Sequence, residues 1–321
     1  MTTNINTDTT TTMQRYQSAD ERVRNGVIGG VRILTGLLWL ANLHWKVSPA
    51  FGEDTGGGLF KYSDSVTRNS PFAPFTWVTE EIILPNFRFF GWIVLISELV
   101  VAALLLIGWR TRIVALAGAL LAVPILLSVI YYDGADEWSW SYLMMIGLNL
   151  VLFATDAGRH VGLDGVLERD PAAARRGLVV VGTVGTVVGL VALYVARSIS
   201  FAGAEVALLG SDAGFVGEDG ALVRRWELKF LFFNPLWAIL TIVFGLALIV
   251  GSRVRWAAWA GAAGFAVLTV VVFVSGTFDY VREDGSIQVI ATAQNAAFWG
   301  GAAVAGALLA RRLAGGSPEH R

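Results

Sequence analysis

The sequence predicts an all-α fold, a polytopic integral membrane protein with about eight transmembrane helices in two tandem, parallel four-helix bundle repeats. Three observations lead to this prediction. The composition is apolar, eight segments are long and apolar, and the second half of the sequence repeats a pattern of the first half at a constant spacing. Hydrophobic residues make up 55% of the 321 residues, charged residues only 15%, and the mean hydropathy is +0.60. Soluble domains are about one quarter charged. Much of this surface is therefore expected to face lipid.

The predicted spans are defined by their length and apolar character. A helix needs about 20 mostly apolar residues to cross roughly 30 Å of hydrocarbon. Eight segments meet this requirement: 26–43, 89–108, 112–132, 139–156, 177–196, 234–252, 256–276 and 289–310. Runs such as 99–107 are apolar on every face, whereas barrel strands alternate apolar and polar residues. The segments are therefore expected to be helices.

An internal repeat organises these helices. A shift of 143 residues places Gly108, Arg110, Arg112 and Gly118 on Gly251, Arg253, Arg255 and Gly261 without a gap. Two units of the same topology predict a parallel repeat with a pseudo-two-fold axis along the membrane normal. The expected units are 26–165 and a diverged 166–312.

The two tails and the charged turns predict an orientation. More than half of the 24 Lys and Arg residues lie in the tails, in the turns at 110–112 and 253–255, and in the connection 157–176. Positively charged segments stay on the cytoplasmic side. We therefore expect both termini in the cytoplasm. The Thr- and Asn-rich tail 1–25 has no secretory signal and is predicted to be disordered, and residues 313–321 form a second tail.

The composition excludes several kinds of chemistry. A net charge of −1 gives no basic excess for nucleic acid. The chain has no cysteine, which excludes thiolate metal sites, iron–sulfur ligation and covalent haem. His44, His160 and His320 fall on opposite sides of the predicted membrane or in a tail. We therefore expect no metal site and no covalently bound cofactor, so redox chemistry would require a borrowed cofactor.

Three polar residues are predicted to form a layer inside the membrane. Counted from the outer ends of their segments, Arg32, Glu98 and Asn149 lie at depths of about 18, 14 and 15 Å. Arg32 and Glu98 are expected to pair, and Asn149 could complete the network. Two interpretations stay open: an ion pair that only fixes helix packing, or a polar pocket that holds a quinone-type head group or passes a proton.

A second group of candidates lies at the predicted outer surface. His44, Trp45 and Lys46 end the first segment, and Trp77 lies in the first long loop, 47–88. They suit an interfacial anchor belt. Alternatively, His44 binds a quinone carbonyl while Lys46 attracts an anionic substrate. Segment 74–85 is predicted to be a short interfacial helix, acting as a lid or an anchor.

Several stretches of the first half carry a family resemblance. They are Arg32-Ile-Leu-Thr-Gly36, Asn42-Leu-His44-Trp-Lys46, Glu98 before Leu104-Leu-Leu-Ile-Gly-Trp-Arg-Thr-Arg112, and Trp140-Ser-Tyr-Leu-Met-Met-Ile-Gly147. Together they resemble the DoxX/DoxD family of four-helix bacterial membrane proteins, over about residues 26–165. The loop motifs Pro71-Phe-Ala-Pro-Phe-Thr-Trp77 and Leu84-Pro-Asn86 are most similar to the DoxD branch, the small membrane subunit associated with thiosulfate:quinone oxidoreductase.

The resemblance implies the membrane subunit of a quinone-linked oxidoreductase in a bacterial or archaeal cell membrane. Such a subunit binds quinone or relays protons without a redox centre of its own. Its implied partners are the lipid bilayer and a redox subunit, in a homo- or hetero-oligomer. The competing hypothesis is a non-catalytic membrane scaffold or a small-solute transporter, which a parallel repeat also suits.

Overall fold

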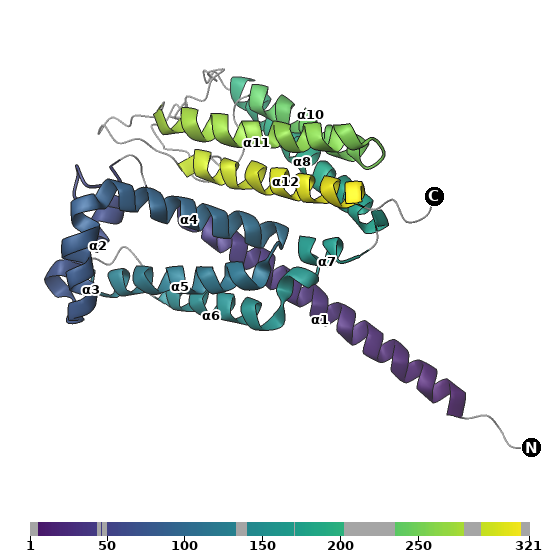
Figure 1. Ribbon diagram of the computed structural model, residues 1–321, viewed down its shortest axis with the longest axis horizontal. Coiled ribbons are helices and arrows are strands. Elements are labelled where there is room, and N and C mark those ends of the chain that lie inside the picture. The colour runs from purple at the N-terminus through teal and green to yellow at the C-terminus, as the bar shows by residue number, and fades with distance from the viewer. Residues whose placement is uncertain are drawn as a thin grey trace, which may run out of the picture.

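The computed structural model describes residues 6–43, 46, 50–132, 140–169, 171–201, 235–278 and 290–315. Within these ranges all regular secondary structure is helical. The helices form two bundles that lie side by side (Figure 1). The prediction of an all-α protein is therefore confirmed for the described part of the chain.

Each bundle consists of four long helices around its own core. The first bundle contains α1 (Asn6–Asn42), α4 (Phe87–Ile107), α5 (Thr111–Ile130) and α6 (Trp140–Thr155). The second contains α8 (Pro171–Phe201), α10 (Pro235–Gly251), α11 (Arg255–Phe278) and α12 (Ile290–Gly315). Their buried apolar residues form two separate clusters. The bundles meet where α12 packs against α4.

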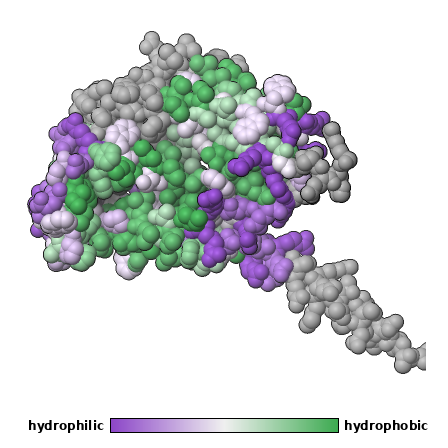
Figure 2. Space-filling view, viewed as in Figure 1, coloured by the Kyte–Doolittle hydropathy of each residue, from purple (hydrophilic) through white to green (hydrophobic). Residues whose placement is uncertain are grey.

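The outer faces of the helices suit contact with lipid. Among the described residues, three helical segments are long and apolar enough to cross a membrane: Ala73–Ile107, Thr111–Ile130 and Pro171–Tyr194. Three shorter apolar helices are Trp140–Thr155, Leu236–Gly251 and Arg255–Val271. On the face shown in Figure 2, apolar residues cover the middle of the protein and hydrophilic residues gather toward both ends. This surface is that of a membrane protein. The number of eight spans stays a prediction.

The two ends of the first bundle differ. The turn between α4 and α5 lies at one end, which we call the turn end, together with the 3-10 helix η4 (Ala157–Arg159) and α7 (Leu163–Leu167). The turn between α10 and α11 points in the same direction (Figure 1). The opposite end, which we call the α2 end, carries α2 (Gly58–Asn69), α3 (Ala73–Val78), the π-helix η2 (Thr79–Ile83) and the 3-10 helix η3 (Leu84–Asn86).

The first long loop is folded against the α2 end. Ser65 Oγ and Asn69 Nδ2 donate to the carbonyl of Tyr131, at the end of α5, over 2.6 and 3.0 Å. The ring of Phe51 lies so close to Gly91 that any side chain there would overlap it. The predicted helix at 74–85 corresponds to α3, η2 and η3. Whether these elements form a lid or an anchor stays a prediction.

The prediction of a disordered tail at 1–25 is wrong for residues 6–25. They are helical and continuous with α1, which projects beyond the body of the protein (Figure 1). Once a helix has formed, each added residue gains a hydrogen bond without a new nucleation cost, so a polar extension can continue a span. Residues 1–5, most of the second long loop (202–233) and tail residues 316–321 lie outside the described ranges.

Candidate functional site

A buried ion pair lies inside the first bundle. Lys46 Nζ is 2.7 Å from Glu98 Oε2, and both side chains are 0% exposed. Glu98 comes from the middle of α4, where that helix packs against α1. Lys46 follows the end of α1, and its Nζ also donates to the carbonyl of Asn42 over 2.8 Å. The carboxylate and the backbone carbonyl together satisfy the ammonium away from water.

Two further polar side chains extend this pair. Asn42 Nδ2 donates to Glu98 Oε1 over 3.2 Å, and Tyr142 Oη donates to Asn42 Oδ1 over 3.1 Å. Tyr142 lies on α6 and is 1% exposed. We call Asn42, Lys46, Glu98 and Tyr142 the buried polar cluster. It joins α1, α4 and α6 through charged and neutral hydrogen bonds.

The buried polar cluster offers acid–base and hydrogen-bonding chemistry in an apolar setting. Its ion pair compensates two charges that would be costly to bury alone. Glu98 is a carboxylate that could exchange a proton, and the Lys46 ammonium and Tyr142 hydroxyl are donors suited to a carbonyl oxygen. Ionisable groups inside membrane helices are usually functional. This cluster is therefore the candidate site.

Arg32 is not the partner of Glu98, which corrects the predicted pairing. Its Nη1 donates to the carbonyls of Leu105 and Leu106 over 2.9 and 3.3 Å, and its Nη2 donates to that of Val161 over 2.9 Å. The last carbonyls of a helix lack partners within the helix, and a cation there also interacts favourably with the helix dipole. Arg32 therefore caps the C-terminal end of α4 at the turn end.

The register of α1 against α4 explains this outcome. Asn42 meets Glu98, so Arg32 falls near the end of α4 because the two helices run antiparallel. The prediction placed the outer ends of both helices at the same level. In the structure α4 continues a helical segment from Ala73 and reaches past the end of α1. Relative to the predicted alignment, α1 is therefore shifted along α4 by roughly 10 Å, or two helical turns.

Asn149 does not join the cluster through the contacts that the structure shows. Its Nδ2 donates to the carbonyl of Met145 in its own helix over 2.8 Å. Its Oδ1 is buried without a hydrogen-bond partner. A side chain at Gly118 of α5 would come within 2.6 Å of that oxygen. The predicted layer of Arg32, Glu98 and Asn149 is therefore divided among three environments.

The predicted outer-surface candidates also have different positions. Lys46 is fully buried within the protein, and its proposed place at the water–lipid boundary stays a prediction. Trp77 lies on α3 and is 59% exposed, and its role as an anchor or substrate contact stays a prediction. His44 and Trp45 lie outside the described residues.

Sequence reasoning missed two members of the cluster. Asn42 and Tyr142 both occur in the stretches that carry the family resemblance, but neither was selected as a site residue. Asn42 and Lys46 lie four residues apart at the end of the first predicted helix, and the closeness of these two polar residues was the available signal. Tyr142 lies at a predicted helix end, where an aromatic residue is ordinarily an interfacial anchor.

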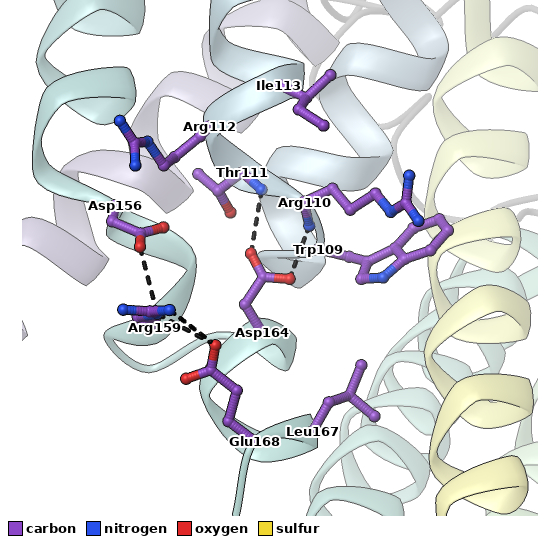
Figure 3. Close-up of a pocket in the computed structure, with 10 residues that line it drawn as sticks. All are labelled: Trp109, Arg110, Thr111, Arg112, Ile113, Asp156, Arg159, Asp164, Leu167 and Glu168. Carbon is purple, nitrogen blue, oxygen red and sulfur yellow. Dashed lines mark hydrogen bonds and ion pairs between the residues drawn. The ribbon is translucent and has the colours of Figure 1, made fainter.

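A groove of about 470 Å³ at the turn end is lined by the charged residues of the α4–α5 turn and of 156–168 (Figure 3). Asp164 accepts hydrogen bonds from the backbone N–H groups of Arg110 and Thr111 over 2.7 and 3.1 Å, and so caps α5. Arg159 pairs with Asp156 and Glu168 over 3.2 and 3.1 Å. These contacts hold the turn together, and we assign the groove a structural role.

One of three comparisons with known proteins found a match, and it covers most of the first bundle and the start of the second. Residues 60–183 match the DoxD family, described as TQO small subunit DoxD. No curated protein and no solved structure matches the chain. The matched segment runs from α2 into α8 and includes Glu98 and Tyr142. Residues 60–183 of this chain are therefore similar to DoxD-type membrane proteins.

Proposed function

We propose that this chain is the membrane subunit of a quinone-linked oxidoreductase, which binds quinone or relays protons while a partner subunit carries the redox centre. The match to a TQO small subunit supports the class of complex. The observation that carries the proposal is the Lys46–Glu98 pair, 2.7 Å long and fully buried among apolar helices. A thiosulfate:quinone reaction is the specific type that the family suggests.

The residues of the buried polar cluster fit a quinone. A bound quinone would supply the two-electron acceptor, and its two carbonyl oxygens need hydrogen-bond donors. The cluster offers donors at Lys46, Asn42 and Tyr142, and the structure connects them in one network. Glu98 would hold or release the proton that accompanies electron transfer, because it is the carboxyl group of the network.

Co-purification and activity test this proposal. Protein extracted in mild detergent is expected to retain quinone, which organic extraction and chromatography would detect. The double variant Lys46→Met with Glu98→Met removes both charges and should still fold, because a buried pair can be replaced by apolar residues of similar size. It should lose quinone binding, and lose turnover when reconstituted with its partner subunit.

A matched control comes from the second bundle. Thr241 is the residue that the 143-residue shift places on Glu98, and it is also fully buried. Thr241→Val is expected to leave quinone binding unchanged. If the double variant in the first bundle also kept full quinone binding and turnover, the cluster would be structural, and the scaffold or transporter hypothesis would take its place.

The proposal includes the architecture of eight spans in two parallel units. Two pairs of contacts support it. Gly118 packs against Val101, and Gly261 packs against the carbonyl of Phe244, which the shift places on Val101. The second arginine of each turn reaches the last helix of its own bundle: Arg112 lies over the ring of Phe153, and Arg255 donates to the carbonyl of Leu313.

The proposed orientation places both termini in the cytoplasm of a bacterial or archaeal cell, with the turn end facing inward. Reporters fused after Arg112, Arg169 and Arg312 should then read cytoplasmic. Reporters at Gly57, Gly134 and Ala213 should read external. An inverted pattern would refute the orientation, and a pattern that needs an odd number of spans would refute the eight-helix architecture.

A further inference from the structure

Buried polar side chains continue from the buried polar cluster toward the turn end. Arg32, Thr35, Trp39 and Lys46 are each at most 1% exposed. The helical spacing of Arg32, Thr35, Trp39 and Asn42 places them along one face of α1, and Lys46 follows the end of that helix. Arg32 marks the turn end of this face, since it bonds to the last carbonyls of α4. A line of polar groups on α1 therefore runs through the otherwise apolar interior of the first bundle.

Five buried side-chain atoms of this interior lack a hydrogen-bond partner among the described residues, and one of them, Glu98 Oε2, is ion-paired with Lys46. The other four are Arg32 Nε, Trp39 Nε1, Thr111 Oγ1 and Asn149 Oδ1. A buried polar atom without a partner costs about 1–3 kcal/mol, and native proteins leave few of them. Among the described residues, all such atoms lie in the first bundle. Their concentration there indicates a ligand that the side chains are arranged to meet.

The chemistry of these atoms identifies the class of ligand. Trp39 Nε1 and Arg32 Nε can only donate, Asn149 Oδ1 can only accept, and Thr111 Oγ1 can do both. A ligand that satisfies them all must both donate and accept, and it must be small enough for a packed helix interior. Water meets both requirements. A purely accepting ligand would leave Asn149 Oδ1 unpaired, and an apolar ligand would leave all four atoms unpaired.

We infer that a file of water molecules enters the first bundle at the turn end and reaches its interior. It passes Arg32 and Thr111 and extends to Trp39 and Asn149. Trp39 lies about one helical turn along α1 from Asn42, which is bonded to Glu98. The file therefore ends beside the buried polar cluster.

Proton transfer along this water file rests on the proposed function, whereas the presence of the water does not. In a proton relay, the O–H bond of the Glu98 carboxyl group breaks as an O–H bond forms on the adjacent water. Each water accepts one proton and releases one, so one proton leaves at the turn end and no electron moves along the file. The Glu98 carboxylate then pairs with Lys46, as in the structure.

Hydrogen exchange of two indole groups tests the inference directly. Trp39 and Trp299 are both 0% exposed, but Trp299 Nε1 donates to Thr241 Oγ1 over 3.0 Å. In D₂O, the indole N–H of Trp39 is expected to exchange at least about a hundredfold faster than that of Trp299, which must await an opening of the second bundle. Nuclear magnetic resonance would follow both signals, with Trp39→Phe and Trp299→Phe variants for assignment.

The backbone amide of Trp39 is the internal control. It lies in α1 and exchanges only when the helix opens, so a fast indole signal beside a slow amide signal reports water entry. Equal rates for the two indoles, or an indole rate equal to the amide rate, would overturn the inference.

A pair of variants locates the file. Asn149→Leu replaces the unpartnered acceptor by an apolar group and is expected to slow exchange at the Trp39 indole at least about tenfold. Thr241→Val, in the second bundle, should leave that rate unchanged. An unaltered rate in Asn149→Leu would refute passage beside Asn149. If this variant did not fold, the wild-type comparison would still decide the inference. Fast exchange in a protein that retains no quinone would refute only the proposed function.

Discussion

The balance of charge at Glu98 can be tested by a substitution that keeps its shape. Glu98→Gln preserves the size of the side chain and an amide oxygen that can accept the hydrogen bond from Asn42 Nδ2. It removes the negative charge. The Lys46 ammonium, 0% exposed and 2.7 Å from the carboxylate in the native protein, then lacks its counter-ion. Breaking a buried pair in this way costs about 3–5 kcal/mol, so the free energy of unfolding should fall by that amount.

Two double-mutant cycles distinguish the possible partners of Glu98. Combined with Lys46→Met, Glu98→Gln should cost at least about 2 kcal/mol less than it does alone, because the stranded cation is gone. In the double variant with Arg32→Met, the loss of unfolding free energy should equal the sum of the single-variant losses within about 0.5 kcal/mol. The reason is distance: Arg32 bonds to the carbonyl of Leu105, about 10 Å from Glu98 along α4.

Reversible unfolding in mixed detergent micelles, followed by tryptophan fluorescence, would measure these free energies. The wild type, the three single variants and the two double variants complete both cycles. Coupling of Glu98 to Arg32 with none to Lys46 would refute the antiparallel register of α1 and α4 on which the site is built. Additive effects in both cycles would refute the buried ion pair itself.

Three further substitutions should lower the free energy of unfolding in the same assay. Gly108→Ala should cost about 1–2 kcal/mol because the backbone φ of Gly108 is 69°. The added methyl group would also overlap Arg32 Nη1, which raises the cost further. An unchanged stability would contradict this packing. Asp164→Ala should cost about 1 kcal/mol by uncapping α5, whereas Asp164→Asn should retain part of the cap. Thr241→Val should cost about 0.5–1.5 kcal/mol by removing the hydroxyl that accepts a hydrogen bond from Trp299 Nε1, and its effect should be smaller in a Trp299→Phe background.

The helical, apolar character of the chain could be predicted from local information. A segment such as 113–127 is apolar on every face, so it can satisfy its backbone in lipid only as a helix. Segment 89–107 is apolar apart from Ser97 and Glu98, and both segments are helices in the structure. The polar extension at 6–25 was the exception, because its helical structure continues from the span that follows it.

The candidate site could be predicted only in part. Glu98 stands out in an apolar helix because a buried carboxylate needs compensation, and the sequence is sufficient to say so. Its partner could not be identified from spacing. Arg32 and Lys46 both lie near enough along the first helix, and the choice depends on an offset of roughly two turns between α1 and α4.

Residue types and their order along the chain therefore account for the membrane helices, for the buried carboxylate and for the resemblance of the first half to the DoxD family. The pairing of Lys46 with Glu98, the link through Asn42 to Tyr142 and the placement of Arg32 on the end of α4 required the folded protein. Helix formation depends on neighbours within a few residues, whereas an ion pair between helices depends on their relative register. That register results from packing contacts such as Gly36 of α1 against Leu106 of α4, which join residues far apart in the chain.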